Sequence, residues 1–471
     1  MTGAAVAPAR SAAFNVLVRE AASRAPFELA AAAAAEFGAL EGRDRGLAYE
    51  LVMGTIKRRN SLDRVIAAFA SASSSRLRPD VREALRLGAF QLLYLDRVPA
   101  HAAVNDAVEL AKRHGQRTGS FVNAVLRRVA ADGRAELARL SAADSTEALA
   151  LRFSHPDWLV ALWVHELGGK AAAELMTADN LPAERCVRVN RLRATPAEAQ
   201  AALAAGGITA RPASGPSREL VRATPDAFLL EGAALESSAA FRDGLVTPQS
   251  RGSQLAAAIA AAGAGDAGVG RAADLCAAPG GKTSQLAALL PGWQVLAADD
   301  EPHRVTALRA NLARLGAHEV EVAERDVLTM GADPEQQGRY DLVLLDAPCS
   351  GLGTLASRPD LRWRRRAGDV ARLAALQQSL LDAAAALVAP GGTLTYSVCT
   401  IARAETLEVV ERFISRGGGD GEPGRPLAWE LDDLGAGYPD LRHAGNGAFV
   451  QTLPSRDQTT GFFVARLRRV D

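Results

Sequence analysis

Short apolar runs alternate with longer helical segments from about residue 241 to the end of the chain, and this alternation restricts the fold more than any other feature. The spacing predicts strands over 271–275, 294–298, 320–323, 341–345 and 392–397. It predicts helices between them, over 284–290, 304–315 and 369–388. Strands that alternate with helices are typical of a doubly wound, mostly parallel sheet. We therefore predict an α/β domain over residues 241–471.

The chain of 471 residues is too long for one hydrophobic core, so two or three domains are expected. Residues 1–150 carry apolar side chains at helical spacing, with Pro79 and Pro99 where helices should begin, and predict an all-helical domain. The serine-rich stretch 71–75 predicts a loop. Residues 151–240 mix helical segments with short strands, which predicts a small α+β segment.

Composition excludes several classes of protein. Hydrophobic residues make up 48% of the chain and charged residues 23%, which excludes an intrinsically disordered protein. No apolar run approaches the roughly 20 residues that cross a bilayer, and the first residues lack the pattern of an export signal. We therefore expect a soluble, cytoplasmic protein with no membrane partner, and we expect a monomer.

The formal net charge of zero hides an asymmetry along the chain. Residues 1–150 carry 21 basic and 16 acidic side chains, a net charge of +5, whereas residues 241–471 carry 24 and 28, a net charge of −4. A basic front end permits nucleic-acid binding, although a solvated arginine-rich surface would give the same charge. The candidate contacts to phosphate are Arg43, Arg58 and Arg59.

A glycine turn follows the first predicted strand of the α/β domain, in Asp274-Leu-Cys-Ala-Ala-Pro-Gly-Gly-Lys-Thr283. Gly280 and Gly281 allow the backbone to approach a ligand closely, and the amides that open the next helix can bind an anion. Asp299 follows the second strand, where a carboxylate typically holds ribose hydroxyls. The turn lacks the dinucleotide fingerprint and the P-loop spacing, so alone it would indicate only an ordinary strand-to-helix turn.

Two of the four cysteines lie at the ends of predicted strands. Cys349 lies in Leu345-Asp-Ala-Pro-Cys-Ser-Gly-Leu-Gly353, and Cys399 lies in Tyr396-Ser-Val-Cys-Thr400. A lone cysteine is more often a small buried hydrophobe, but two at strand ends that face one ligand edge favour thiol chemistry. Neither a metal site nor a disulfide is expected from the widely scattered set of Cys186, Cys276, Cys349 and Cys399.

Together these motifs resemble the signatures of the RNA cytosine-C5 methyltransferases of the NOL/NOP/Sun type, which use S-adenosylmethionine (SAM). The matching segments are DLCAAPGGKT (274–283), DAPCSGLG (346–353) with Arg358-Pro-Asp360, and YSVCT (396–400). The resemblance extends over nearly the whole chain. The front resembles a NusB-like RNA-binding domain in 43–59 and 101–128, and the segment that precedes the catalytic domain in this family is matched in 154–160 and 188–190. The resemblance implies a Rossmann-like methyltransferase domain, and the NusB-like front implies a 16S ribosomal RNA target.

The resemblance also implies a role for individual residues. The loop that holds the methionine end of SAM would consist of Cys276, Ala277, Ala278, Pro279, Gly280, Gly281 and Lys282. Asp299 would bind the SAM ribose, and Asp326 would lie near the adenine. Asp346 would lie between cofactor and base and would act in catalysis with Lys282. Cys399 would be the nucleophile, and Cys349 would assist release of the product.

The reaction explains why these groups are needed. Carbon 5 of cytosine becomes nucleophilic enough to accept a methyl group only after the Cys399 thiolate has added to carbon 6. Asp346 would stabilise the activated ring through N3, and Cys349 or a water molecule would remove the carbon-5 proton. The target base must leave its stack to reach such a site.

Other interpretations stay open. The same reaction on transfer RNA or large-subunit ribosomal RNA is the main alternative, because the catalytic motifs do not encode the target. A non-catalytic RNA-binding assembly or antitermination factor is disfavoured by the intact Cys349, Cys399, Lys282 and Asp346. A DNA cytosine methyltransferase is disfavoured because it would use its proline–cysteine motif for the nucleophile. The sequence departs mildly from the family pattern at Ser250, Val398, Ala404, Thr406 and Thr460.

Overall fold

The first part of the chain is built from helices around an apolar core. The structure, a computed structural model, describes residues 6–23, 27–32, 34–70, 77–113, 115–265, 268–417 and 428–470, so the stretch 71–75 lies outside the described residues. The helices are α1 (Pro8–Ser23), α2 (Phe27–Ala32), α3 (Ala35–Gly38), α4 (Gly42–Lys57), α5 (Arg59–Phe69), α6 (Pro79–Tyr94), α7 (Ala100–Lys112), α8 (Gln116–Leu140), α9 (Thr146–Phe153), α10 (Asp157–Leu167) and α11 (Gly169–Ala178).

The sequence signals for these helices hold in the structure. Pro79 is the first residue of α6 and Pro99 directly precedes α7, where the missing amide of proline costs nothing. Apolar residues at helical spacing in α4 and α5 are fully buried, among them Leu51, Ile56, Leu62 and Ile66. The all-helical front is therefore confirmed. Within the described residues, no helix combines the length and the apolar character that a membrane span requires.

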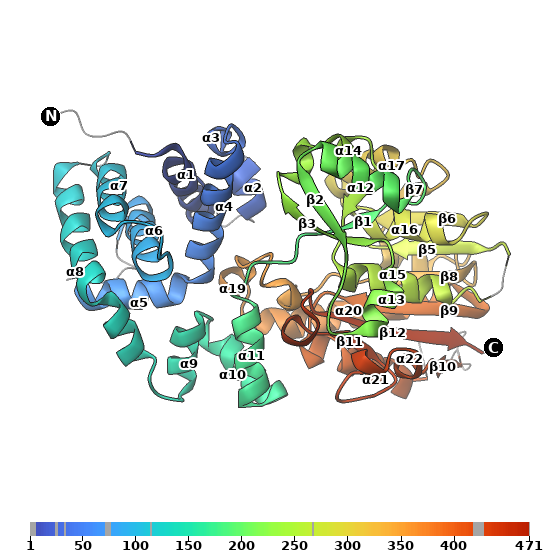
Figure 1. The fold of residues 1–471 in the computed structure, drawn as a ribbon. Coiled ribbons are helices and arrows are strands. Elements are labelled where there is room, and N and C mark those ends of the chain that lie inside the picture. Colours follow the sequence, from blue (N-terminus) through green and yellow to red (C-terminus); the bar gives the residue numbers. More distant parts are fainter. Residues whose placement is uncertain are drawn as a thin grey trace. The chain divides into compact units, whose positions relative to one another are not determined.

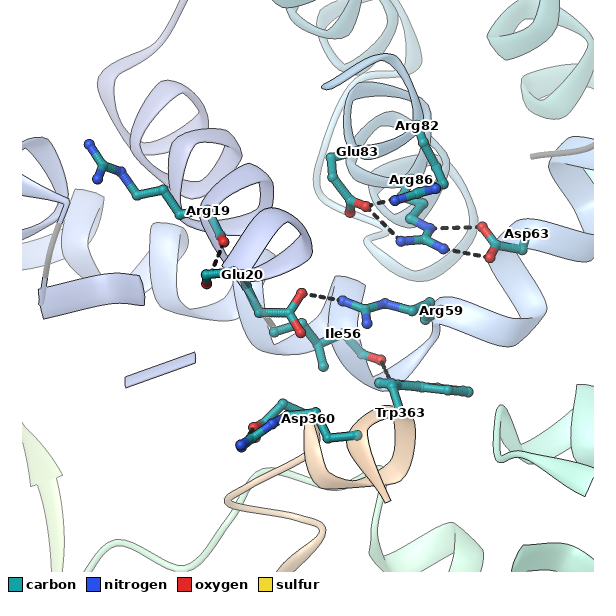
Figure 2. Close-up of polar contacts among 12 residues, drawn as sticks. Arg19, Glu20, Ile56, Arg59, Asp63, Arg82, Glu83, Arg86, Asp360 and Trp363 are labelled. Atoms are coloured by element: carbon teal, nitrogen blue, oxygen red, sulfur yellow. Dashed lines mark hydrogen bonds and ion pairs between the residues drawn. The ribbon is translucent and has the colours of Figure 1, made fainter. Parts of the chain in front are cut away.

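A short segment from much later in the chain belongs to this helical unit. Contacts divide the chain into one unit of Met1–Leu181 with Arg358–Arg366 and another of Pro182–Ser357 with Ala367–Asp471. The inserted segment contains α19 (Leu361–Arg364), and its Trp363 indole donates to the Ile56 carbonyl at 2.8 Å (Figure 2). Its neighbour Arg362 is fully buried and donates to four oxygen atoms of this unit. The domain boundaries at 150 and 240 stay a prediction.

The second unit opens with a small antiparallel sheet. Its strand order is β2 (Ile208–Pro212), β3 (Ala227–Gly232), β1 (Cys186–Val189) and β4 (Val246–Pro248). The accompanying helices are α12 (Pro196–Ala205), α13 (Arg218–Ala223) and α14 (Ala239–Arg242). A capping box starts α12, because the Thr195 hydroxyl accepts from the Glu198 amide while the Glu198 carboxylate accepts from the Thr195 amide.

A larger sheet forms the centre of the second unit (Figure 1). Its parallel strands lie in the order β9 (Val388–Val398), β8 (Tyr340–Asp346), β5 (Arg271–Leu275), β6 (Gln294–Asp299) and β7 (Glu321–Glu324). All five correspond to predicted strands. Three antiparallel strands that we did not predict extend the β9 edge: β12 (Phe462–Arg469) pairs with β9, and β10 (Trp429–Leu431) and β11 (Val450–Thr452) pair with β12.

Helices cover both faces of the large sheet. On β8, Leu342 and Leu344 pack toward α15 (Arg251–Ala262) and α16 (Gly281–Leu289), while Val343 and Leu345 pack toward α20 (Ala367–Leu387) and α21 (Leu407–Ser415). This alternation follows from the two-residue period of a strand. The remaining helices are α17 (Pro302–Leu315), α18 (Val327–Ala332), α22 (Leu434–Gly437) and α23 (Pro454–Asp457). The doubly wound, Rossmann-like architecture is confirmed.

Candidate active site

The predicted site residues meet at one edge of the large sheet. Cys276 follows β5, Asp299 ends β6, Asp346 ends β8 and Cys399 follows β9. These strands are parallel neighbours, so their carboxyl ends open on the same side, where ligands bind in doubly wound sheets. Asp326 lies just beyond β7, where its side chain caps α18 by accepting from the Leu328 amide at 2.9 Å.

The glycine turn after β5 is anchored on the next strand and helix. Cys276 and Gly280 both adopt positive φ angles, 59° and 94°, which turn the chain sharply between β5 and α16. The Ala278 amide donates to the Asp299 carboxylate at 3.1 Å. The Ala278–Pro279 peptide bond is cis. The Asn311 side chain in α17 donates to the Pro279 carbonyl at 2.7 Å. The turn is therefore held in one shape without a ligand.

The backbone at the start of α16 has room for a Cβ atom in ordinary contact with its neighbours. A Cβ atom placed on Gly281, the first residue of this helix, would meet nothing nearer than the Gln249 side chain at 3.8 Å. The amides at a helix N-terminus attract an anionic group. A small carboxylate can therefore approach the backbone here.

Lys282 and Asp346 form an ion pair beside the cysteines. Lys282 Nζ lies 2.6 Å from Asp346 Oδ2, and the Ser397 hydroxyl donates to Asp346 Oδ1 at 2.7 Å. Burial by itself would lower the pKa of Lys282, but interaction with the carboxylates of Asp346 and Asp274 and with Cys399 raises it overall. Lys282 therefore remains a cation next to Cys399, and a neighbouring cation favours a thiolate.

A second carboxyl group lies behind the glycine turn. The Asp274 side chain is buried and accepts from the Thr283 hydroxyl at 2.6 Å. Burial raises the pKa of Asp274 to about 7, against the opposing effects of Thr283 and Lys282. Asp274 and Asp346 therefore differ in environment, since only Asp346 is partly exposed to the site.

The two predicted catalytic cysteines are in contact. Their Sγ atoms lie 3.3 Å apart, although Cys349 follows β8 and Cys399 follows β9. The hydrogen bond to Cys399, together with burial, raises the pKa of Cys349 well above its ordinary value. Either sulfur atom can be the donor in this contact. No group of three His, Cys, Asp or Glu side chains that could hold a metal occurs in the part of the chain that the structure describes.

Asp299 is already engaged by protein groups. Its side chain is fully buried, and Arg304 Nη2 lies 3.1 Å from the same oxygen that accepts from the Ala278 amide. Arg304 is itself about a third exposed, at 36%. A ligand hydroxyl that binds this oxygen of Asp299 would therefore have to displace Arg304.

The three arginines proposed to contact RNA have different environments within the helical unit. Arg43 is exposed. The guanidinium of Arg58 lies 4.7 Å from the centre of the Tyr94 ring. Arg59 forms an ion pair with Glu20 at 2.6 Å, and Glu20 is only 3% exposed (Figure 2). The structure therefore does not bring the three together as one exposed group, and their contact with RNA stays a prediction.

Comparisons with known proteins identify the family. The family description 16S rRNA methyltransferase RsmB/F matches residues 269–468, the NusB family matches residues 7–131, and the RsmF/B-like ferredoxin-like domain matches residues 155–233. A probable ribosomal RNA small subunit methyltransferase B of Bacillus subtilis is 33% identical over 91% of this chain and 92% of its own length. The chain belongs to the 16S rRNA methyltransferase RsmB/F family.

Two further similarities extend over most of this RsmB/F-family chain. A putative methyltransferase of Mycobacterium tuberculosis is 38% identical, over 98% of this chain and 97% of its own length. The crystal structure of a methyltransferase homologue from Pyrococcus horikoshii superposes with a TM-score of 0.57 at 25% identity, and the match covers 69% of this chain and 99% of that one.

Sequence reasoning missed one buried arginine of this RsmB/F-family protein. Arg188 lies on β1, is 2% exposed, and donates to the Ser284 hydroxyl at 2.8 Å and to the Gly281 carbonyl at 3.3 Å. It also donates to Gln249 at 2.7 Å. Arg188 therefore supports the glycine turn and α16 from the small sheet. A charged residue inside the apolar strand 186–189 was the available signal.

Two residues that depart from the RsmB/F-type sequence pattern contact each other. The hydroxyl groups of Ser250 and Thr460, at positions where aspartates were expected, form a hydrogen bond of 2.8 Å. Ser250 also caps α15, and Thr460 lies just before β12. The contact therefore joins two uncharged hydroxyl groups, and each has a hydrogen-bond partner.

Proposed function

We propose that this protein transfers a methyl group from SAM to carbon 5 of a cytosine in 16S ribosomal RNA, through a covalent adduct with Cys399. The observation that carries the proposal is the pair of thiols, 3.3 Å apart, at the carboxyl ends of two neighbouring parallel strands. The charged groups of Lys282 and Asp346 lie beside this pair. A protein that merely binds RNA would not need either feature.

The groups at the sheet edge fit the parts of SAM. The amides at the start of α16 suit its carboxylate, and Asp299 suits its ribose hydroxyls once Arg304 is displaced. Asp346 is partly exposed and suits a cationic neighbour, and Asp326, exposed beyond β7, lies on the side proposed for the adenine. When bound, SAM supplies an electrophilic methyl group. The loop from Cys276 to Lys282 would hold it, with a shape already fixed by Asn311 and Asp299.

Cys399 would act first. Its thiolate, favoured by the Lys282 cation and by the hydrogen bond from Cys349, adds to carbon 6 of the cytosine, and carbon 5 becomes nucleophilic. Asp346 would contact N3 of the ring, since Ser397 and Lys282 fix its orientation. Carbon 5 then accepts the methyl group. It now carries both this group and a hydrogen, which must leave as a proton before the ring double bond can re-form.

Cys349 would act second, because adduct formation changes its environment. While Cys399 is a thiolate, the hydrogen bond between them raises the pKa of Cys349. Once the Cys399 sulfur is bonded to carbon 6, that contribution is lost and the pKa of Cys349 falls, while burial still holds it above its ordinary value. Cys349, or a water molecule, then removes the carbon-5 proton, the double bond re-forms, and Cys399 leaves as the thiolate.

The helical unit would supply RNA binding. Its segment 1–150 carries a net charge of +5, whereas residues 241–471 carry −4. A net negative catalytic domain is poorly suited to hold a polyanion without help. We therefore assign RNA recognition to the front of the chain.

Methyl transfer from labelled SAM tests the proposal directly. The full chain should label 16S ribosomal RNA, and digestion of the product should release labelled 5-methylcytosine at one position. Transfer RNA and 23S ribosomal RNA serve as competing substrates in parallel reactions. Preferential labelling of either would replace 16S RNA as the target, and label on any atom other than carbon 5 of cytosine would refute the reaction.

A further inference from the structure

One buried carboxylate touches the residue that follows each of the two cysteines. Glu405, at the end of the 3-10 helix η4 (Arg403–Glu405), has no exposed surface. Its Oε1 atom accepts from the Ser350 amide at 2.8 Å, and Ser350 directly follows Cys349. Its Oε2 atom accepts from the Thr400 hydroxyl at 3.3 Å, and Thr400 directly follows Cys399. A single side chain therefore joins the ends of β8 and β9.

Further hydrogen bonds reinforce this link on both sides. The hydroxyls of Ser350 and Thr400 lie 2.9 Å apart, so the two loops also contact each other directly. Gln377 in α20 donates to Glu405 at 3.0 Å and to the Pro348 carbonyl at 2.9 Å. The residues before and after Cys349 are thus held by Gln377 and Glu405.

The Glu405 carboxylate is itself held in place. The main-chain carbonyl of Glu405 accepts from the Tyr396 hydroxyl at 2.7 Å, and Tyr396 is a fully buried residue of β9. Burial raises the pKa of Glu405, while its hydrogen-bond donors oppose the shift. A charged group in such surroundings needs every one of its partners, so the loops cannot move apart without leaving it unsatisfied.

We propose that Glu405 is a positioning residue that fixes the separation of Cys349 and Cys399 by binding the residue after each. The inference rests on the proposed function, because that reaction needs both sulfur atoms within reach of one pyrimidine ring. Glu405 touches neither substrate nor cofactor in this role. It acts through the backbone of one loop and the side chain of the other.

Two substitutions at this position separate geometry from charge. Glu405→Gln keeps an oxygen for the Ser350 amide and for Gln377, and its new NH₂ group can donate to the Thr400 hydroxyl, which rotates to accept. It should keep kcat within about threefold of the wild type, whereas Glu405→Ala should lower kcat by about 100-fold, the cost of misplacing a reacting group by about 1 Å. The KM for SAM should stay unchanged in both, since Glu405 does not contact the glycine turn.

A matched control comes from another carboxylate of the same unit. Asp432 accepts from Arg466 Nε at 2.6 Å and joins β10 to β12, away from the cysteine loops. Asp432→Ala removes a polar link of a side chain that is 23% exposed, and it should leave kcat unchanged. A similar loss of kcat in Asp432→Ala and Glu405→Ala would show that general destabilisation explains both, and would overturn the proposal.

A second measurement needs no RNA. Alkylation of the full chain with iodoacetamide, read by peptide mass spectrometry, reports the accessibility and reactivity of each thiol. Glu405→Ala should change the rates at Cys349 and Cys399 and leave the rate at buried Cys186 as it is, and Glu405→Gln should restore the wild-type rates. Unchanged rates in a folded Glu405→Ala protein, or a Glu405→Gln enzyme as inactive as Glu405→Ala, would refute positioning.

Two further comparisons keep the result decisive. If Glu405→Ala does not fold, Gln377→Leu removes one donor to Glu405 and the contact with Pro348, and it should lower kcat by about tenfold as a partial misplacement. Wild-type kcat in Gln377→Leu would then refute the proposal. Product mapping separates this test from that of the proposed function: a wild-type product other than 5-methylcytosine refutes the function, while the ratio of kcat between the Ala and Gln variants still measures positioning.

Discussion

The Sγ atoms of Cys349 and Cys399 lie in hydrogen-bond contact, 3.3 Å apart, between the ends of two neighbouring strands. In the proposed reaction Cys399 acts as a thiolate, and a Cys349 thiol that donates to it would stabilise that charge and could not act as a base at the same time. The proposed order of events, with Cys399 acting first and Cys349 second, rests on this contact.

Replacing each cysteine should stop the reaction at a different stage. Cys399→Ala should abolish methyl transfer while SAM affinity stays nearly unchanged, because the glycine turn lies on another strand. Cys349→Ala should form the adduct through Cys399 and fail to release it, which a shifted band on a denaturing gel of protein and RNA would reveal. Cys186→Ala, a change in the buried β1 strand, serves as the control and should behave as the wild type.

Either cysteine assignment can fail by itself. Substantial turnover by Cys399→Ala would exclude it as the nucleophile. A Cys349→Ala enzyme that binds RNA and SAM but yields no adduct would exclude the release role, and a water molecule would then be the proton acceptor.

Replacing Asp299 should weaken SAM binding, whereas replacing its partner Arg304 should not. Asp299→Ala removes a charge-assisted hydrogen bond to the ribose, which should weaken SAM binding by about 1.5–3 kcal/mol. Arg304→Gln removes the competitor that lies 3.1 Å from the carboxylate, so SAM should bind equally well or more tightly. Titration calorimetry measures both. Unchanged affinity in Asp299→Ala would place the cofactor elsewhere.

Arg188 should matter for SAM binding although it lies outside the cofactor loop. Arg188→Met removes its bonds to Ser284 and Gly281, so the turn and the start of α16 lose a buried support, and SAM affinity should fall by about tenfold, a coupling of about 1.4 kcal/mol. The control is Arg185→Met, because Arg185 is exposed and donates to carbonyls at the end of β3. Equal SAM affinities for the two variants would show that Arg188 serves only the stability of the small sheet.

Local patterns explain what the sequence could predict, and long-range pairs explain what it could not. The strands, the glycine turn and the acids and thiols after each strand follow from residues adjacent in the chain. Arg188 and Ser284 are 96 residues apart, and their contact depends on where β1 lies against α16. Trp363 and Ile56 are 307 residues apart, so no local pattern could assign α19 to the helical unit. The antiparallel strand β12 was missed for the same reason, since only its pairing with β9 identifies it as part of the sheet.

Asp274 should make the stability of the protein depend on pH. Burial raises its pKa from 3.8 to about 7 in the folded state, so the folded protein binds this proton more tightly than the unfolded chain. Its contribution to stability is full below about pH 4 and is lost as the pH rises through about 7, a change on the order of 4 kcal/mol at most. Asp274→Asn cannot titrate, so denaturation in urea at pH 5 and pH 8 should show a smaller loss of stability than in the wild type. An equal loss in both proteins would mean that the carboxyl group ionises at its ordinary pKa.

Arg43 and Arg59 should separate RNA binding from folding in the helical unit. Arg43 is exposed, so Arg43→Gln should remove one phosphate contact and lower the slope of log affinity against log salt by about 1. Arg59 is paired with Glu20, which is only 3% exposed, so Arg59→Met should leave that slope unchanged and lower stability, by as much as about 3–5 kcal/mol, because a buried charge loses its partner. Binding of a 16S RNA fragment at several salt concentrations, together with thermal denaturation, measures both quantities on the intact chain. A truncation at residue 240 would be a poorer test, since it would remove Arg188 from beneath α16 and Ile56 from Trp363 along with the proposed RNA-binding surface. If Arg43→Gln keeps the wild-type slope, its surface does not bind RNA, and the +5 charge of this region is only a solvated surface.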